Sequence, residues 1–305
     1  MGAHGPTQVH NLAAGQRPSF VTRPPSATPA LLAALLVAAP VLAGVGYAAA
    51  GALGLAGVGA AGYTTARLGR VLADGAAWAS LAFTVRTALA STLLATALGV
   101  LVAVTFRGAR ASDRLARALA VVPLPVPQVV AASCAVLILG QSGLLSRLAH
   151  AAGLVDAPPD MPALVYDRAG LALTLALAWK EFPFLALVAG SVLATRGAVA
   201  EEAARTLGAT PWQAFRRVTW PLLWRGLLPS VVAVFAFVAG SYEAAALLGP
   251  SDPLPLQSLV RERYADPELA RRGDAYVLTL LALALAALAV AVHEWAAERR
   301  AVDGA

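Results

Sequence analysis

Long apolar stretches separated by short polar segments dominate the pattern of this 305-residue chain. A run of about 20 apolar residues is long enough for a helix to cross the hydrocarbon layer of a bilayer. The pattern predicts six such spans, at residues 30–50, 79–105, 118–140, 169–193, 227–249 and 275–293. Leucines alternate within the fourth span, but the residues between them are also apolar or small, which favours a helix over a barrel strand. We therefore expect an all-α polytopic membrane protein.

The composition supports this class. Hydrophobic residues make up 59% of the chain and charged residues 13%, against about 25% charged residues in soluble domains. The net charge of +6 comes from basic residues scattered over short segments, so it does not indicate a nucleic-acid partner. We expect the lipid bilayer to surround most of the surface.

Three features that could indicate enzyme chemistry lack the context that such chemistry needs. Residues 57–62 read GVGAAG, but no βαβ unit surrounds this glycine pattern. His293 and Glu294 begin a string like HExxH, yet Ala297 stands where the second histidine would be. The single cysteine, Cys134, lies in an apolar run and is expected to pack. The sequence therefore predicts no catalytic residue, no metal site and no cofactor held by this chain.

The ends of the chain and the arginines predict sidedness. Residues 1–28 are polar and rich in proline, so we expect a disordered cytoplasmic tail, with a membrane domain at 29–295 and a cytoplasmic tail at 296–305. Thirteen arginines fall in the segments on the side of the termini and eight on the other side. Because arginine and lysine are enriched in cytoplasmic loops, both termini and the loop at 194–226 are predicted to be cytoplasmic.

This loop has the most specific pattern in the chain. Residues 201–223 read EEAARTLGATPWQAFRRVTWPLL. Residues 198–207 are expected to form a helix that ends at Gly208, a residue suited to the left-handed conformation found after helices. Thr210, Pro211 and Gln213 then form a capping box with proline at the first helical position. Pro221 is expected to disfavour continuation of this second helix.

The spacing of Glu202, Ala203, Ala204, Gly208 and Pro221 closely resembles the EAA loop of permease subunits of binding-protein-dependent ABC importers of type I. Val218 and Trp220 stand where isoleucine and leucine are usual in that family, and both remain apolar. The likeness extends over roughly residues 63–293, including AWKEFPF at 178–184 and GSYEAAALLGP at 240–250. The last segment loosely resembles the branch that moves polyamines, thiamine, iron or sulfate-like solutes.

The resemblance implies a function and a set of partners. In this family the loop docks into a cleft on the ATPase, which implies that Glu202, Ala203, Ala204 and Gly208, with Phe215 and Pro221, couple this chain to that subunit. It also implies two ABC ATPase subunits that bind the ATP, a second permease that is a copy or a paralogue, and an extracytoplasmic solute-binding protein. The chain would be a multi-pass protein of the bacterial cytoplasmic membrane.

Charged residues near the apolar spans are candidates for the translocation pathway. Lys180 and Glu181 lie near the middle of the fourth span, where each charge is costly, so the pair should face protein or an aqueous cavity. Tyr242 and Glu243 lie near the outer end of the fifth span and could meet a cationic solute. For both pairs, a purely structural role in helix packing stays open.

Two other classes of function would need features that the sequence lacks. An ion-coupled secondary transporter would be favoured by inverted internal repeats, and none is visible in the sequence. An intramembrane enzyme would need a nucleophile and a base, or metal ligands, within the spans, and the four histidines form no cluster.

Overall fold

The computed structural model describes residues 27–302 except residues 58 and 61. Residues 1–26, most of the predicted N-terminal tail, lie outside this range. The chain divides into two units, Met1–Val45 and Gly46–Ala305. Helix α1 (Ala27–Ala52) begins in the first unit and contains Pro40. All regular elements of the described residues are helical, so the predicted all-α class is confirmed.

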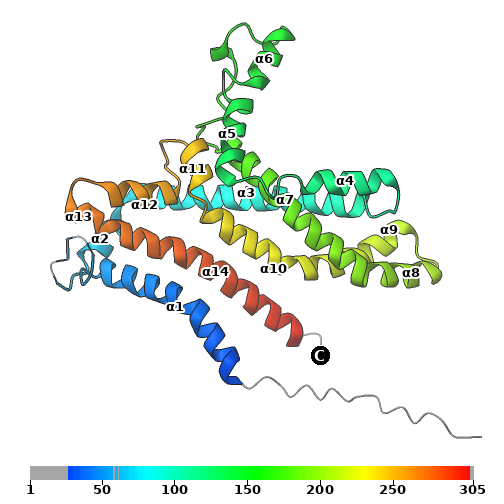
Figure 1. Ribbon diagram of the computed structural model, residues 1–305, viewed down its shortest axis with the longest axis horizontal. Helices are drawn as coiled ribbons and strands as arrows, with labels where there is room; N and C mark the ends of the chain where they lie inside the picture. The colour runs from blue at the N-terminus through cyan, green and yellow to red at the C-terminus, as the bar shows by residue number, and fades with distance from the viewer. Residues whose placement is uncertain (1–26, 58, 61, 303–305) are drawn as a thin grey trace, which may run out of the picture. The chain divides into compact units, whose positions relative to one another are not determined.

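The second unit contains the other helices, drawn in Figure 1. Two short helices, α8 (Ala198–Thr206) and α9 (Pro211–Ala214), belong to the functional site. The other α-helices are α2 (Ala66–Ala73), α3 (Gly75–Thr105), α4 (Ala111–Val121), α5 (Gln128–Leu139), α6 (Leu144–Ala151), α7 (Leu171–Val192), α10 (Trp220–Ala239), α11 (Glu243–Leu248), α12 (Leu256–Ala265), α13 (Leu269–Arg272) and α14 (Asp274–Val302).

Six helical segments of the described residues are long and apolar enough to cross a membrane, which agrees with the predicted number. They are Leu31–Ala52, Gly75–Thr105, Gln128–Ala151, Leu171–Thr195, Pro211–Ala239 and Asp274–Arg299. The first, second, fourth and sixth segments match the predicted spans to within a few residues. Helix α14 continues through Val302, so most of the predicted C-terminal tail at 296–305 is helical.

Helices α3 and α7 form the centre of the second unit and lie side by side (Figure 1). Ala88, Ala95, Gly99 and Ala103 are buried on one side of α3, and small residues at such spacings let two helices approach closely in a membrane. A Cβ atom added at Gly99 would lie 2.9 Å from the backbone nitrogen of Ala186. The contact between the two helices therefore requires glycine at position 99.

The third span differs from the prediction at 118–140. Helix α4 ends at Val121, and a turn containing Pro123, Pro125 and Pro127 separates it from α5. Proline lacks the amide donor that a helix interior uses, so the cluster divides one apolar run into two helices. Helix α5 packs on α7 and α11, while α6 packs on α5 and extends away from α3 (Figure 1).

The fifth span also differs, because α10 begins earlier and ends earlier than the predicted 227–249. It ends at Ala239, and the apolar residues beyond it form the separate helix α11. Ala244 and Leu248 are buried in the same core as α3 and α7. The apolar run past residue 239 thus reflects burial in the protein rather than continuation of one span, a distinction that hydropathy alone does not make.

Candidate functional site: the loop between α7 and α10

The predicted two-helix loop is present between α7 and α10. Its helices are α8 (Ala198–Thr206) and α9 (Pro211–Ala214). Gly208 between them has φ +90°, the left-handed conformation that glycine adopts at low cost. The capping box is also confirmed. The Thr210 hydroxyl accepts from the Gln213 amide at 3.3 Å, and the Gln213 side-chain oxygen accepts from the Thr210 amide at 2.9 Å.

A π-helical turn stands on each side of this pair of helices. The turn η2 (Leu193–Gly197) joins α7 to α8, and η3 (Phe215–Thr219) joins α9 to α10. The expectation that Pro221 ends the helix is wrong, because the chain stays helical from Pro211 to Ala239. The Trp220 amide bonds to the carbonyl of Phe215, five residues back. Wider turns of this kind disturb the regular ladder next to proline and are frequent at functional sites.

Glu201 is the buried charge of the loop. Its carboxylate accepts two hydrogen bonds from the Arg107 guanidinium, at 2.7 and 3.1 Å, and one from the Thr219 hydroxyl at 3.1 Å. The Arg107 hydrogen bonds are the main cause that lowers the pKa of Glu201 below its usual range, against the opposing effect of burial. No local pattern in the sequence points to this role, because Arg107 lies 94 positions away.

The residues predicted to couple to an ATPase lie mostly on the outer face of the loop. Glu202, Ala203 and Gly208 are exposed, and Ala204 is half-buried. Pro221 is exposed, and the half-buried Phe215 stacks against Trp212 with ring centroids 5.8 Å apart. The row of rings continues with Trp220 and Trp224. Glu201 and Glu202 are neighbours in sequence, yet one faces the interior and the other faces outward.

Three large apolar side chains, on α8, next to Gly208 and on α9, are exposed. The exposed fractions of Val199, Leu207 and Trp212 are 75%, 89% and 66%. Scattered apolar residues are common on any protein surface. Three large exposed apolar side chains within residues 199–212 are typical of a surface that another protein covers.

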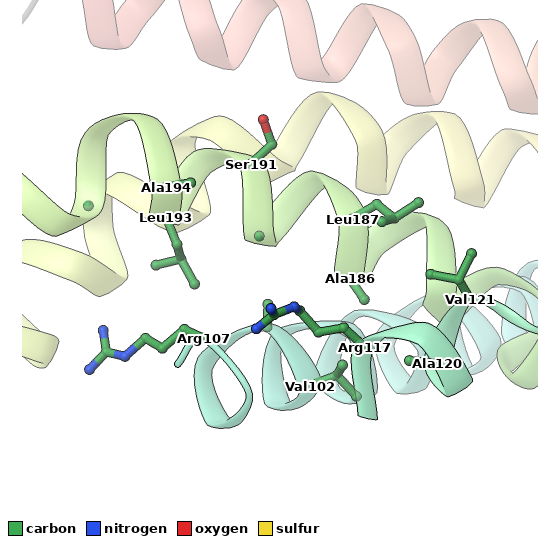
Figure 2. Close-up of a pocket in the computed structure, with 13 residues that line it drawn as sticks. Val102, Arg107, Arg117, Ala120, Val121, Ala186, Leu187, Ser191, Leu193 and Ala194 are labelled. Carbon is green, nitrogen blue, oxygen red and sulfur yellow. The ribbon is translucent and has the colours of Figure 1, made fainter. Parts of the chain in front are cut away.

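A cavity of about 560 Å³ lies beside the loop, between α3 and α4 on one side and α7 with η2 on the other (Figure 2). Its lining is mostly apolar and includes Val102, Leu187 and Ala194 together with the arginines Arg107 and Arg117. Arg117 donates to the backbone carbonyls of Phe106 and Gly108. Both guanidinium groups are therefore engaged by protein acceptors at this cavity.

Of the two predicted pathway residues in α7, Lys180 bonds to the proline turn. The Lys180 ammonium donates to the backbone carbonyl of Leu124 at 3.0 Å, and both Lys180 and Glu181 are half-buried. The prolines around Leu124 remove amide donors from this turn, which leaves its carbonyls available to a side chain. Helix α7 continues through Pro183, so this proline does not end it.

The other predicted pair lies outside the fifth span. Tyr242 precedes α11 and Glu243 is its first residue, so the expected position near the end of the span is corrected. Tyr242 lines a cavity of about 330 Å³ together with Tyr166, Ser251 and Ser258, and Glu243 is exposed. Neither Lys180 nor Glu181 lines this cavity.

The fold and the loop define a multi-pass, all-helical membrane protein with a structured segment between its fourth and fifth spans. Residues 95–302 match the family described as binding-protein-dependent transport system inner membrane component. This match covers more than half of the sequence, and the chain belongs to that family. It is therefore a membrane transport component of the type I ABC importer class and not an enzyme.

Relatives and solved structures agree with this assignment. The chain is 33% identical over 219 residues to the molybdenum transport system permease protein ModB of Mycobacterium bovis, covering 69% of this chain and 76% of the relative. It is 33% identical over 186 residues to the sulfate transport system permease protein CysW of Synechocystis, covering 59% and 63%. A bacterial alginate ABC transporter has the same fold at 15% identity, with a TM-score of 0.68 and coverage of 87% and 90%.

These comparisons also bear on the predicted branch. Molybdenum and sulfate permeases are among the relatives, and a branch for polyamine, thiamine or iron is not supported. Sulfate, which is also among the solutes named for that branch, is the solute in the name of one relative.

Proposed function

We propose that this chain is one of two permease subunits of an ATP-driven importer and that the loop between α7 and α10 docks on a separate ATPase. The observation that carries the proposal is the loop itself. It exposes Val199, Leu207 and Trp212, and its two helices are joined by a turn with a left-handed glycine, Gly208. A cytoplasmic position of this loop and of both termini agrees with the arginine bias.

In this proposal the second permease is a copy or a paralogue, and two ATPase subunits bind ATP. An extracytoplasmic binding protein delivers the solute. ATP favours one of two conformations through differential binding. The coupling residues are Glu202, Ala203, Ala204, Gly208, Phe215 and Pro221. Family membership disfavours the alternative of an ion-coupled secondary transporter.

The class of solute that we propose is a small tetrahedral oxyanion such as molybdate or sulfate. The support is the molybdenum and sulfate permeases among the relatives. Lys180, Glu181, Tyr242 and Glu243 remain candidates for the pathway.

Docking is tested by co-purification of the ATPase with Leu207→Glu, using Leu154→Glu as the matched control. Both leucines are exposed, at 89% and 77%, and the proposed topology places them on opposite sides of the membrane. We expect Leu207→Glu to lose the ATPase, because the substitution places a charge in an apolar interface, and Leu154→Glu to retain it. Equal retention in both variants would contradict docking through this loop.

Uptake is tested with the complete complex in proteoliposomes. With its binding protein present, the complex should take up labelled molybdate or sulfate only when ATP is supplied inside. Uptake that follows an ion gradient without ATP would contradict the proposal.

A further inference from the structure

Three separate elements meet at Glu201. It lies in the first turn of α8, its partner Arg107 follows the end of α3, and Thr219 ends the π-turn η3. The Glu201 side chain is 11% exposed, and Thr219 is fully buried. The carboxylate is therefore a buried junction between the loop, α3 and the start of α10.

The charges at this junction are complementary. The Arg107 guanidinium approaches Glu201 from α3 with two hydrogen bonds, Thr219 donates from η3, and Arg205 adds a favourable charge from α8 itself. Paired hydrogen bonds between arginine and a carboxylate fix orientation as well as distance. Loss of such a partner leaves a buried carboxylate uncompensated and strongly destabilises the folded protein. The junction therefore holds α8 in one orientation relative to α3.

Two π-turns and a cavity lie next to this junction. The loop is joined to its two spans through the π-turns η2 and η3. Beside it, the cavity of about 560 Å³ separates α3 and α4 from α7 and η2 (Figure 2). Next to this space, the side-chain contact between Arg107 and Glu201 connects the end of α3 to the loop.

We infer that Glu201 is a positioning residue that, through Arg107 and Thr219, makes the loop and the cytoplasmic end of α3 move together. A displacement of α8 then reaches α3 directly, in addition to passing along the chain into α7 and α10. Because α3 packs along α7, the two central helices move as a pair. This inference rests on the proposed docking of the loop on an ATPase.

The test compares uptake with ATP hydrolysis in the reconstituted complex, using labelled molybdate and sulfate as probes. The variants are Glu201→Gln, which keeps the shape but removes the charge, and Thr219→Val, which removes only the hydroxyl. Thr219→Ser keeps the hydroxyl and is the matched control. Co-purification of the ATPase and its hydrolysis rate are measured for every variant alongside uptake.

We expect Glu201→Gln and Thr219→Val to retain the ATPase and to hydrolyse ATP, while uptake per ATP falls about fivefold or more, the usual size of coupling between sites. Thr219→Ser should keep the wild-type ratio. A merely structural role would lower complex yield and leave uptake per ATP unchanged in the complexes that form.

The inference is overturned if uptake per ATP in Thr219→Val equals that of wild type, whether or not Glu201→Gln folds. A different failure, in which the wild-type chain binds no ATPase, would remove the proposed function and this inference with it. A wild-type complex with normal uptake and unaffected variants would remove the inference alone.

Discussion

The contact between α3 and α7 and the loop that follows α7 each depend on a glycine, but for opposite reasons. At Gly99 a Cβ atom would meet backbone at 2.9 Å, and φ is ordinary. At Gly208 a Cβ atom would meet nothing within 4 Å, but φ is +90°. Glycine is thus required at the helix contact because a side chain has no space there, and in the loop because of the backbone conformation. The two regions can therefore be perturbed separately.

The largest effect is expected for Gly99→Leu. The new side chain would force α3 away from the backbone of α7, and overpacking in a core typically costs about 1–3 kcal/mol, occasionally more. We expect a large loss of folded protein in membranes and a lower melting temperature in detergent. Gly69→Leu is the control, because nothing lies within 4 Å of a Cβ at that position. Equal yields for the two variants would show that the close contact is not required.

Gly208→Ala should have a smaller and more local effect. An L-residue in the left-handed region costs about 1–2 kcal/mol, so the turn between α8 and α9 should change conformation while the spans still insert. We expect normal membrane yield with reduced uptake and reduced stimulation of the ATPase. Gly208→Asn should retain more activity, since asparagine tolerates this conformation better. Full uptake in Gly208→Ala would mean that the turn need not be left-handed.

Acidification should weaken the loop but not the helix contact. The pKa of Glu201 is lowered in the folded protein, so its carboxylate contributes stability above its unfolded pKa of about 4.3. That contribution is lost as the pH falls through the lower folded value. The stability difference between wild type and Glu201→Gln, measured by thermal unfolding, should stay constant from about pH 7 to 5 and shrink below that. A difference that grew on acidification would contradict the ion pair.

The smallest effect on stability is expected for Lys180→Met. The variant loses the hydrogen bond to Leu124, worth about 1.5–3 kcal/mol for a charged donor, but it also removes the cost of placing an ammonium group in the span. These terms oppose each other, so the melting temperature should change little. Uptake is measured in parallel. Unfolding of this variant would show that the proline turn depends on Lys180.

Much of the fold could be predicted from the sequence. The number of spans follows from runs of apolar residues, whose length is set by the thickness of the bilayer. The loop helices, their break at Gly208 and the cap at Thr210 are confirmed, because they depend on residues within a few positions of one another. The effect of Pro221 was predicted wrongly, since the π-turn before it accommodates a proline that a regular helix would not.

The local sequence determined the apolar spans, the capped helix and the left-handed turn, because these features depend on residues that are close together in the chain. The tertiary structure alone decided that Glu201 rather than Glu202 faces inward, that Lys180 meets Leu124, and that the apolar run after Ala239 folds as a separate helix. In each of these cases the deciding partner lies far away along the chain. Burial and charge pairing depend on which distant elements pack together, and the hydrophobic pattern of a single segment does not identify those elements.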